Sequence, residues 1–184
     1  MSDDGLEPEH RWERTGERFA AARSLDDVVS VLRQSARRLI GADGVAVVLR
    51  EDGCCHYVAE DAIEPLWKGQ RFPLEACVSG WAMLNDETVV VPDVTLDPRV
   101  PVAPYRNKSI SSLVMVPVGS PEPVAALGAY WCALVFLDEA TVFRAEALAR
   151  QAGDALDRIR TGAATRTNAA RERSPQDHVQ HAGG

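Results

Sequence analysis

The segment VAVVLREDGCCHYVAE, residues 45–60, decides the fold class. Its first part, Val45–Leu49, is a nearly continuous β-favouring run, which predicts an inner strand covered on both faces. Asp52-Gly53 is a hairpin signal, so Cys54–Glu60 is expected to return as the partner strand. Because a hairpin requires antiparallel pairing, the sheet around this segment is expected to be antiparallel.

Helices are expected on both sides of the hairpin. Ser24 and Asp27 have the spacing of a capping box, and Gly41 stands where a left-handed residue ends a helix, so residues 24–40 are predicted to be helical. A weaker apolar stripe predicts one more helix within residues 6–22. Elsewhere the patterns predict helices at 75–85 and 138–159, and strands at 88–91, 112–118 and 124–132.

The order of these elements predicts an α+β fold, an α/β sandwich. Its centre is an antiparallel sheet of about five to six strands, with the terminal helices on one face and ligand-type loops on the other. Pro117 predicts an edge or a bulge for its strand. A chain of 184 residues suits one domain. We expect an N-terminal helical extension at 1–22, the domain at 23–160 and a disordered tail at 161–184, where apolar periodicity stops.

Composition excludes several classes of function. The net charge is −7 and arginines alternate with acidic residues, which argues against nucleic-acid binding because phosphates need a surplus of clustered cations. No apolar run is long enough to cross a membrane. The N-terminal residues are acidic and polar, unlike a secretory signal, so a cytoplasmic location is expected. The four cysteines lie near apolar neighbours, which is consistent with reduced thiols.

The segment Pro92–Asn107 is the strongest candidate for a functional site. It is a long, proline-punctuated connection between two expected strands, and such connections are often functional. Asp93, Arg99, Tyr105 and Arg106 cluster in it. Either arginine could hold an anionic group through two hydrogen bonds, and Tyr105 could stack on a ring or hydrogen-bond to it. A satisfied loop network is an equal alternative for these four residues.

Several motifs, in order, resemble those of the GAF sensory domain. They are Phe72-Pro-Leu-Glu-Ala-Cys-Val-Ser-Gly-Trp-Ala82, Val89-Val-Val-Pro-Asp-Val94, Asp97-Pro-Arg99 and Ser112-Leu-Val-Met-Val-Pro-Val118. Pro104-Tyr-Arg106 and Gly128-Ala-Tyr-Trp131 look closest to the GAF domains of bacterial sensor histidine kinases. The resemblance covers residues 20–160. It implies a ligand cavity between the sheet and the loops that connect its later strands, and terminal helices that lie together and often form a dimer.

Residues that specific GAF activities need are missing. Bilin-carrying members attach the pigment to a cysteine in the later loops, and residues 92–112 contain none. The free methionine sulfoxide reductases of this fold have a cysteine before the glycine of the short-helix motif, where this chain has Ser79. Cys54 and His56 could share a strand face, but zinc needs three or four protein ligands. We therefore expect no metal and no enzyme activity, and we assign no cofactor. A thiol enzyme that uses Cys77 or Cys132 is the weaker alternative.

These observations predict a stand-alone GAF-type sensory or regulatory domain that binds an unidentified small molecule and signals through its terminal helices. The expected protein partners are a histidine kinase or another signalling protein, as in a bacterial two-component system, and a second copy of the chain in a homodimer. The alternative is a ligand-free dimerisation or partner-docking module with a filled cavity. The candidate ligand-binding residues are Trp81, Asp93, Arg99, Tyr105, Arg106, Ser112 and Trp131.

Overall fold

A computed structural model describes residues 7–172, and it contains the predicted elements together with two short ones, β3 and α4. Along the chain the elements are α1 (Pro8–Ala21), α2 (Leu25–Ile40), β1 (Gly44–Glu51), β2 (Cys54–Ala62), β3 (Arg71–Pro73), the 3-10 turn η2 (Leu74–Ala76), α3 (Val78–Asn85), β4 (Val89–Val91), α4 (Val102–Tyr105), β5 (Ser112–Val118), β6 (Ala125–Trp131) and α5 (Glu139–Glu172). Within residues 7–172, no helix has both the length and the apolar character needed to cross a membrane.

The six strands form one antiparallel sheet in the order β3-β2-β1-β6-β5-β4. β1 lies near the middle, between its hairpin partner β2 and the late strand β6. Val45–Leu49 is buried throughout, as the sequence predicted for an inner strand. The α+β class with an antiparallel sheet is therefore confirmed.

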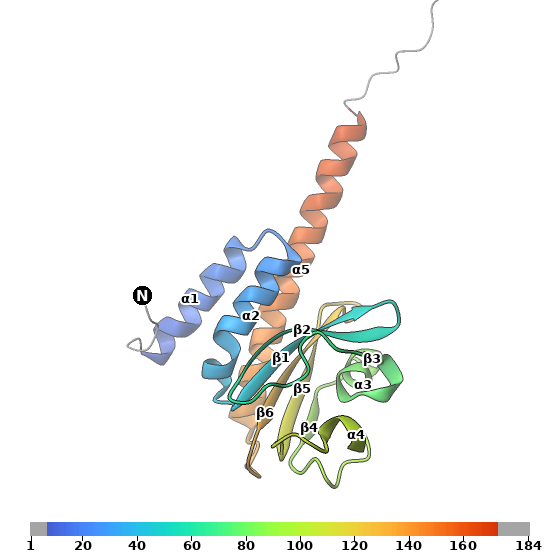
Figure 1. The fold of residues 1–184 in the computed structure, drawn as a ribbon. Helices are drawn as coiled ribbons and strands as arrows, with labels where there is room; N and C mark the ends of the chain where they lie inside the picture. The colour runs from blue at the N-terminus through green and yellow to red at the C-terminus, as the bar shows by residue number, and fades with distance from the viewer. Residues whose placement is uncertain (1–6, 173–184) are drawn as a thin grey trace, which may run out of the picture.

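The two faces of the sheet carry different layers (Figure 1). α2 and α5 cover one face, which we call the helix side, and α1 packs on these two helices. α3, α4 and their loops cover the other face, the loop side. Alternate residues of β1 serve the two cores, with Val45 and Val47 on the helix side and Ala46 and Val48 on the loop side.

The ends of α2 are built as the sequence predicted. Ser24 Oγ accepts a hydrogen bond from the Asp27 backbone N at 3.1 Å, and an Asp27 carboxylate oxygen accepts one from the Ser24 backbone N at 3.1 Å. Gly41 ends the helix with φ 82°, a conformation that favours glycine. This well-defined helix carries much of the helix-side core.

β2 contains a bulge. Val47 of β1 pairs with Ala59, but Val48 pairs with Tyr57, so Val58 is an extra residue without a partner in β1. Before the bulge, Cys55 and Tyr57 face the loop side, whereas after it Ala59 belongs to the helix-side core. Simple alternation along this strand would not place these side chains correctly.

Pro117 lies on β5 beyond the reach of β4. The pairing of β4 with β5 covers Leu113 to Met115, whereas Pro117 pairs only with Ala126 of β6. Its missing N–H therefore faces a locally free edge, in agreement with the prediction.

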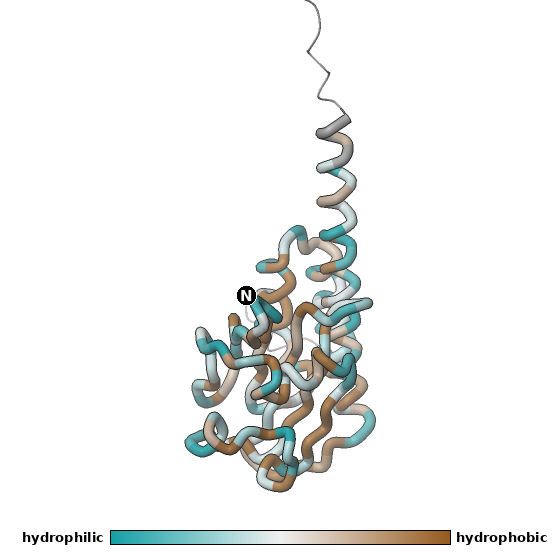
Figure 2. The backbone as a smooth tube through the Cα atoms, turned by 90° about the vertical axis from the view of Figure 1, so that its right-hand side faces the viewer, coloured by the Kyte–Doolittle hydropathy of each residue, from teal (hydrophilic) through white to brown (hydrophobic). Residues whose placement is uncertain are grey.

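α5 extends further than predicted. The sequence predicted a helix end at residue 159 and a tail from 161, but the helix continues to Glu172 and its C-terminal half stands clear of the sheet (Figures 1 and 2). Residues 160–172 are rich in alanine and arginine, which are strong helix formers, and Arg160 pairs with Asp157 at 3.1 Å. Such a segment needs no apolar face to be helical. The rest of the expected tail, 173–184, lies outside the described residues.

Candidate functional site

Five aromatic rings fill the space between the sheet and the loops on the loop side, and we call them the aromatic layer: Tyr57, Trp67, Phe72, Tyr105 and Tyr130. The Trp67 ring lies 5.5 Å from Tyr57, 4.8 Å from Tyr105 and 5.7 Å from Tyr130, measured between ring centroids. Phe72 lies 5.6 Å from Tyr57. The Trp67–Tyr105 pair is tilted and the other three pairs are edge-to-face, and aromatic contacts at these distances are stabilising beyond the area that they bury. The interior that the family resemblance marks as a ligand cavity is therefore occupied by side chains.

A hollow of about 650 Å³ opens instead within residues 94–110. Tyr105 lines it and presses its ring against Trp67 of the aromatic layer. Burial raises the pKa of the Tyr105 hydroxyl, so it stays protonated and can act as a donor. The remaining lining is mostly apolar and comes from Val94, Leu96, Val100, Val102 and Ile110.

Arg106 and Lys108 supply the positive charge of this hollow. Arg106 is exposed, and its side chain makes no hydrogen bond or ion pair with any residue in the described range 7–172. Lys108 Nζ donates to the carbonyl oxygens of Pro65 and Leu66 at 2.7 and 2.6 Å, and it lies 5.6 Å from the Trp67 ring centroid. Lys108 thus fastens the loop to the aromatic layer, whereas Arg106 is available to a ligand.

Lys108 and Trp67 were missed by the sequence analysis. Trp67 also donates from Nε1 to the Pro104 carbonyl oxygen at 3.3 Å, which ties α4 to the same layer. Neither residue lies in a recognisable motif, and the two are joined only by tertiary contacts. The one available signal was the position of Lys108 just after the proline-punctuated segment.

Asp93, Asp97 and Arg99 each have polar partners within the loop, in two separate groups. Asp93 accepts hydrogen bonds from Thr95 N at 2.9 Å and from Thr95 Oγ1 at 2.7 Å, which lower the pKa of its carboxyl. Arg99 donates from Nε and from a terminal nitrogen to Asp97 at 3.0 and 2.6 Å, which lowers the pKa of that carboxyl. The Arg99 guanidinium also lies 5.0 Å from the centroid of the Trp81 ring. The carboxylate of Asp93 and the guanidinium of Arg99, which a ligand would need as hydrogen-bonding partners, are thus already engaged within the protein.

Ser112 and Trp131 have structural contacts. Ser112 Oγ is buried, donates to the Pro92 carbonyl oxygen at 2.7 Å and accepts from Val135 N at 3.1 Å. Trp131 packs in the helix-side core and donates from Nε1 to the Gly41 carbonyl oxygen at 2.9 Å. Of the seven candidates, the structure brings only Tyr105 and Arg106 together at the hollow.

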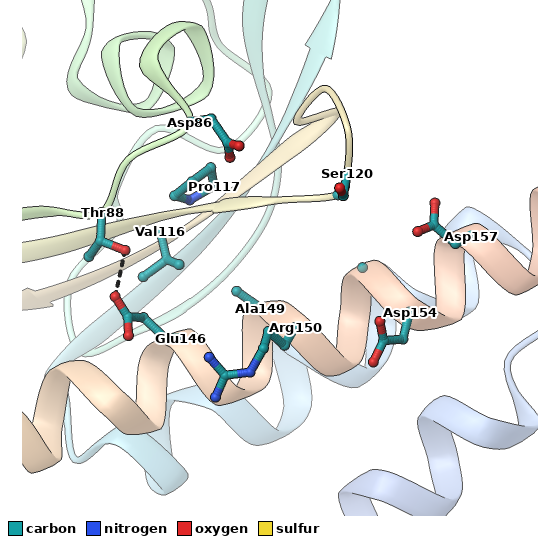
Figure 3. A pocket seen from close by; sticks show the side chains of 12 residues that line it. Asp86, Thr88, Val116, Pro117, Ser120, Glu146, Ala149, Arg150, Asp154 and Asp157 are labelled. Carbon is teal, nitrogen blue, oxygen red and sulfur yellow. Dashed lines mark hydrogen bonds between the residues drawn. The ribbon is translucent and has the colours of Figure 1, made fainter.

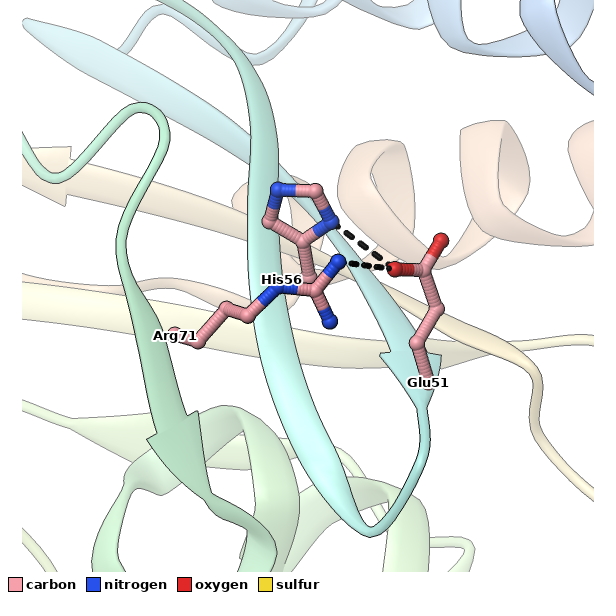
Figure 4. A network of polar contacts seen from close by, with 3 residues as sticks. All are labelled: Glu51, His56 and Arg71. Atoms are coloured by element: carbon pink, nitrogen blue, oxygen red, sulfur yellow. Dashed lines mark hydrogen bonds and ion pairs between the residues drawn. The ribbon is translucent and has the colours of Figure 1, made fainter.

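Two other clusters of polar side chains lie outside this hollow. A hollow of about 350 Å³ lies between α5 and the ends of β4 and β5; Asp86, Asp154 and Asp157 are among its lining residues, and Thr88 hydrogen-bonds to Glu146 there (Figure 3). At the sheet edge, Glu51 accepts hydrogen bonds at 2.9 Å from both His56 and Arg71, as Figure 4 shows.

The contact with Glu51 concerns the metal site considered for Cys54 and His56. His56 and Arg71 both hold the pKa of the Glu51 carboxyl below its usual value, with His56 the larger cause. His56 is therefore engaged by a carboxylate rather than by the neighbouring thiol. Among residues 7–172, no group of three or more histidine, cysteine or acidic side chains is placed to hold a metal ion.

The chain is similar to known proteins in one family. Residues 22–157 match the family model described as a GAF domain. A search of curated proteins finds no match. Among solved structures, the GAF domain of an Acinetobacter phosphoenolpyruvate-protein phosphotransferase is 15% identical with a TM-score of 0.69, covering 89% of this chain and 99% of that one. The phycoerythrobilin-bound GAF domain of a cyanobacterial phytochrome is 18% identical with a TM-score of 0.68, covering 86% and 98%.

A third neighbour corrects the expectation that the chain is not an enzyme. The free methionine-R-sulfoxide reductase of Neisseria meningitidis, solved with its substrate, is 19% identical with a TM-score of 0.71, covering 88% of this chain and 95% of that one. The expectation rested on the lack of a recognised catalytic set. Because an enzyme shares the whole fold, that inference was wrong.

Proposed function

The chain belongs to the GAF domain family, and on that premise we propose that it is a sensory or regulatory domain that binds a small anionic molecule. The observation that carries the proposal is the hollow at residues 94–110, with Arg106 unpaired at its wall. Its volume of about 650 Å³ is in the range of small-molecule sites. The phytochrome neighbour, which holds phycoerythrobilin, supports the class of function.

The lining selects the chemistry of the ligand. Asp97 is the one carboxylate among the described lining residues, and Arg99 already neutralises it through two hydrogen bonds. The cations Arg106 and Lys108 therefore dominate the field, and an arginine can hold a carboxylate or phosphate through two hydrogen bonds. The apolar walls favour a ligand with an apolar body beside its anionic group.

A hydrogen-bonded route joins this loop to α5. Val94 N donates to the Ser111 carbonyl oxygen at 2.9 Å, and Ser111 N donates to the Trp131 carbonyl oxygen at 2.8 Å. The next residue, Ser112, accepts from Val135 N in the segment that leads into α5. A ligand that moves the loop can thus act on the last helix, as signalling through the terminal helices requires.

The test uses 8-anilinonaphthalene-1-sulfonate, an anionic aromatic probe that fluoresces on binding. We expect saturable binding to the folded protein, weakened about tenfold in Arg106→Ala, which corresponds to about 1.4 kcal/mol. Arg160→Ala removes the same charge from an exposed position on α5 and is the matched control. If both variants weaken probe binding equally, the loss of net charge alone explains the effect, and the assignment of the binding site to the hollow is wrong.

A ligand-free dimerisation or docking module is the second candidate, because it predicted a filled cavity. The aromatic layer fits that prediction, and Leu134, Phe136 and Phe143 are large apolar side chains exposed to solvent. Native mass spectrometry of freshly purified protein separates the two candidates. A bound mass lost on denaturation supports the sensor, whereas a clean dimer without binding of the probe supports the module. A kinase partner, a two-component system and a cytoplasmic location stay predictions from the sequence.

A further inference from the structure

A patch of exposed apolar side chains lies where the chain enters α5. Leu134 and Phe136 in the preceding segment and Phe143 in α5 have 66%, 91% and 60% of their surface exposed. Exposed and inward-facing residues alternate in the segment, because Val135 and Leu137 pack against the helix-side core. Large apolar side chains gathered on a surface in this way often mark an interaction site.

A groove of about 740 Å³ lies beside these side chains. Val90 of β4, Leu137 and Val142 give it an apolar floor, since all three are partly buried against the helix-side core. β4 ends the sheet, and in the described range 7–172 no strand pairs with its outer edge. Phe143 lines the groove, and Phe136 directly precedes Leu137 in the chain. The patch thus combines a projecting ring with a hollow that could accept one.

The charges on this face of α5 have a symmetric order. Four residues follow one another along the face at spacings of four, three and four: Glu139, Phe143, Glu146 and Arg150. Glu139 and Arg150 are exposed, and the Arg150 guanidinium lies 5.6 Å from the Phe143 ring centroid. The two ends of the stripe are about 16 Å apart along the helix, so they cannot pair within one chain. A second copy of the stripe in the opposite direction would set acid against arginine at both ends.

The parts of this chain outside the described range do not fit the patch. Residues 173–184 follow Glu172, which lies about 43 Å from Phe143 at the rise of an α-helix. The segment spans at most about 43 Å when fully extended, so it would use all its length to return. Residues 1–6 carry two aspartates, which the carboxylates of Glu139 and Glu146 at the groove would repel. A second copy fits instead, because a two-fold interface brings the same patch from each chain.

We propose that the chain forms a two-fold dimer through this patch, with the first halves of the two α5 helices antiparallel. Phe136 of each copy then enters the groove of the other, and each Glu139 pairs with Arg150 of the partner subunit. Phe136 and Phe143 expose roughly 300 Å² per copy, at about 200 Å² for a whole phenylalanine. Leu134 and the groove bring the area buried on both copies to about 1,000 Å², the lower limit for a specific interface. We therefore expect a dimer that dissociates at micromolar concentrations.

This surface differs from the one that α1 covers. α1 is held on another side of α5, where Arg158 donates a hydrogen bond to the Phe19 carbonyl oxygen at 2.9 Å. The patch instead borders β4, because Glu146 accepts a hydrogen bond from Thr88 just before that strand. It shares no lining residue with the hollow at residues 94–110, so dimerisation does not depend on a ligand bound there.

Sedimentation velocity of the full chain across micromolar concentrations tests the dimer. We expect a reversible monomer–dimer equilibrium, weakened more than about tenfold when Phe136→Ser and Phe143→Ser are combined. Ile63→Ser is the matched control, because it removes an apolar side chain that is 64% exposed just after β2, and it should leave the equilibrium unchanged. A chain that stays monomeric throughout overturns the proposal. So does a dimer that the phenylalanine variants leave intact, because it would form through another surface.

Charge reversal tests the antiparallel arrangement. Glu139→Arg and Arg150→Glu each place like charges opposite one another and should weaken the dimer about fivefold. The double variant should recover the affinity of the wild type, because the pair forms again with its charges exchanged between the copies. Additive weakening in the double variant would overturn the proposal. Since these variants keep the apolar contacts, they decide the question even if circular dichroism shows that the serine variants do not fold.

Discussion

Replacing Gly80 by alanine should destabilise the protein, although alanine is the better helix former. Gly80 is buried in α3, and a Cβ built there would lie 1.8 Å from the Leu74 carbonyl oxygen, where real Cβ atoms essentially never come within 3.0 Å. The obstacle is backbone, so η2 and α3 must separate. Helix propensity returns about 1 kcal/mol, whereas overpacking of this severity costs about 3 kcal/mol. We expect a net loss of about 2 kcal/mol in the free energy of unfolding.

The assay is urea unfolding followed by tryptophan fluorescence and by far-ultraviolet circular dichroism. Gly16→Ala in α1 is the matched control, because the nearest atom to its new Cβ is a side-chain oxygen of Gln151 at 3.8 Å. That variant should gain about 0.5–1 kcal/mol. The two identical substitutions should therefore move the midpoint in opposite directions. A Gly80→Ala protein as stable as wild type, with an unchanged denaturant slope, would refute the reasoning.

The remaining predictions concern the loop and the thiol. Ser112→Ala should lower the free energy of unfolding by about 2 kcal/mol, because it leaves the Val135 N–H and the Pro92 carbonyl oxygen without their buried partner. Urea unfolding measures this loss, and a loss of probe binding at unchanged stability would contradict the structural role. Lys108→Met should lower the free energy of unfolding by about 1–2 kcal/mol, because it removes two charge-assisted hydrogen bonds at a partly exposed site. Arg106→Ala should leave the thermal midpoint of unfolding within about a degree or two of wild type, because no such bond is lost. The pKa of the Cys77 thiol is lowered to about 7, so its alkylation by iodoacetamide should accelerate as pH rises through about 7, because the thiolate is the reactive form; a midpoint near the ordinary thiol value would contradict this lowering.

Local signals in the sequence were enough to predict the architecture. The Asp52-Gly53 turn, the capping box at Ser24 and the left-handed Gly41 each depend on a few neighbouring residues, and each is present in the structure. β3 was missed because it has three residues and exists through its pairing with β2. Short edge strands of this kind have no periodicity to detect.

The candidate site was predictable only in part. Tyr105 and Arg106 stand out in a long loop, and the structure places both at the hollow. Trp131 could not be placed on one face from sequence, because every residue of β6 is buried and the alternation of polar and apolar side chains that would mark a face is missing. The pairing of Cys55 with Phe72 depends on the β2–β3 register, which no local pattern reveals.

The bulge at Val58 gives the β1–β2 hairpin a way to reject the wrong register during folding. With the extra residue, Asp61 faces α2 and pairs with Arg37 at 3.0 Å, while Glu60 faces the loops and accepts from the backbone N–H groups of Leu66 and Lys68. An even alternation without the bulge would exchange these two carboxylates, setting Asp61 against the aromatic layer and turning Glu60 away from the turn that it holds. Each misplaced carboxylate would raise the energy of the wrong register, because it would lose its partners. The two adjacent acidic residues therefore favour the correct register by charge, in addition to the burial of apolar side chains.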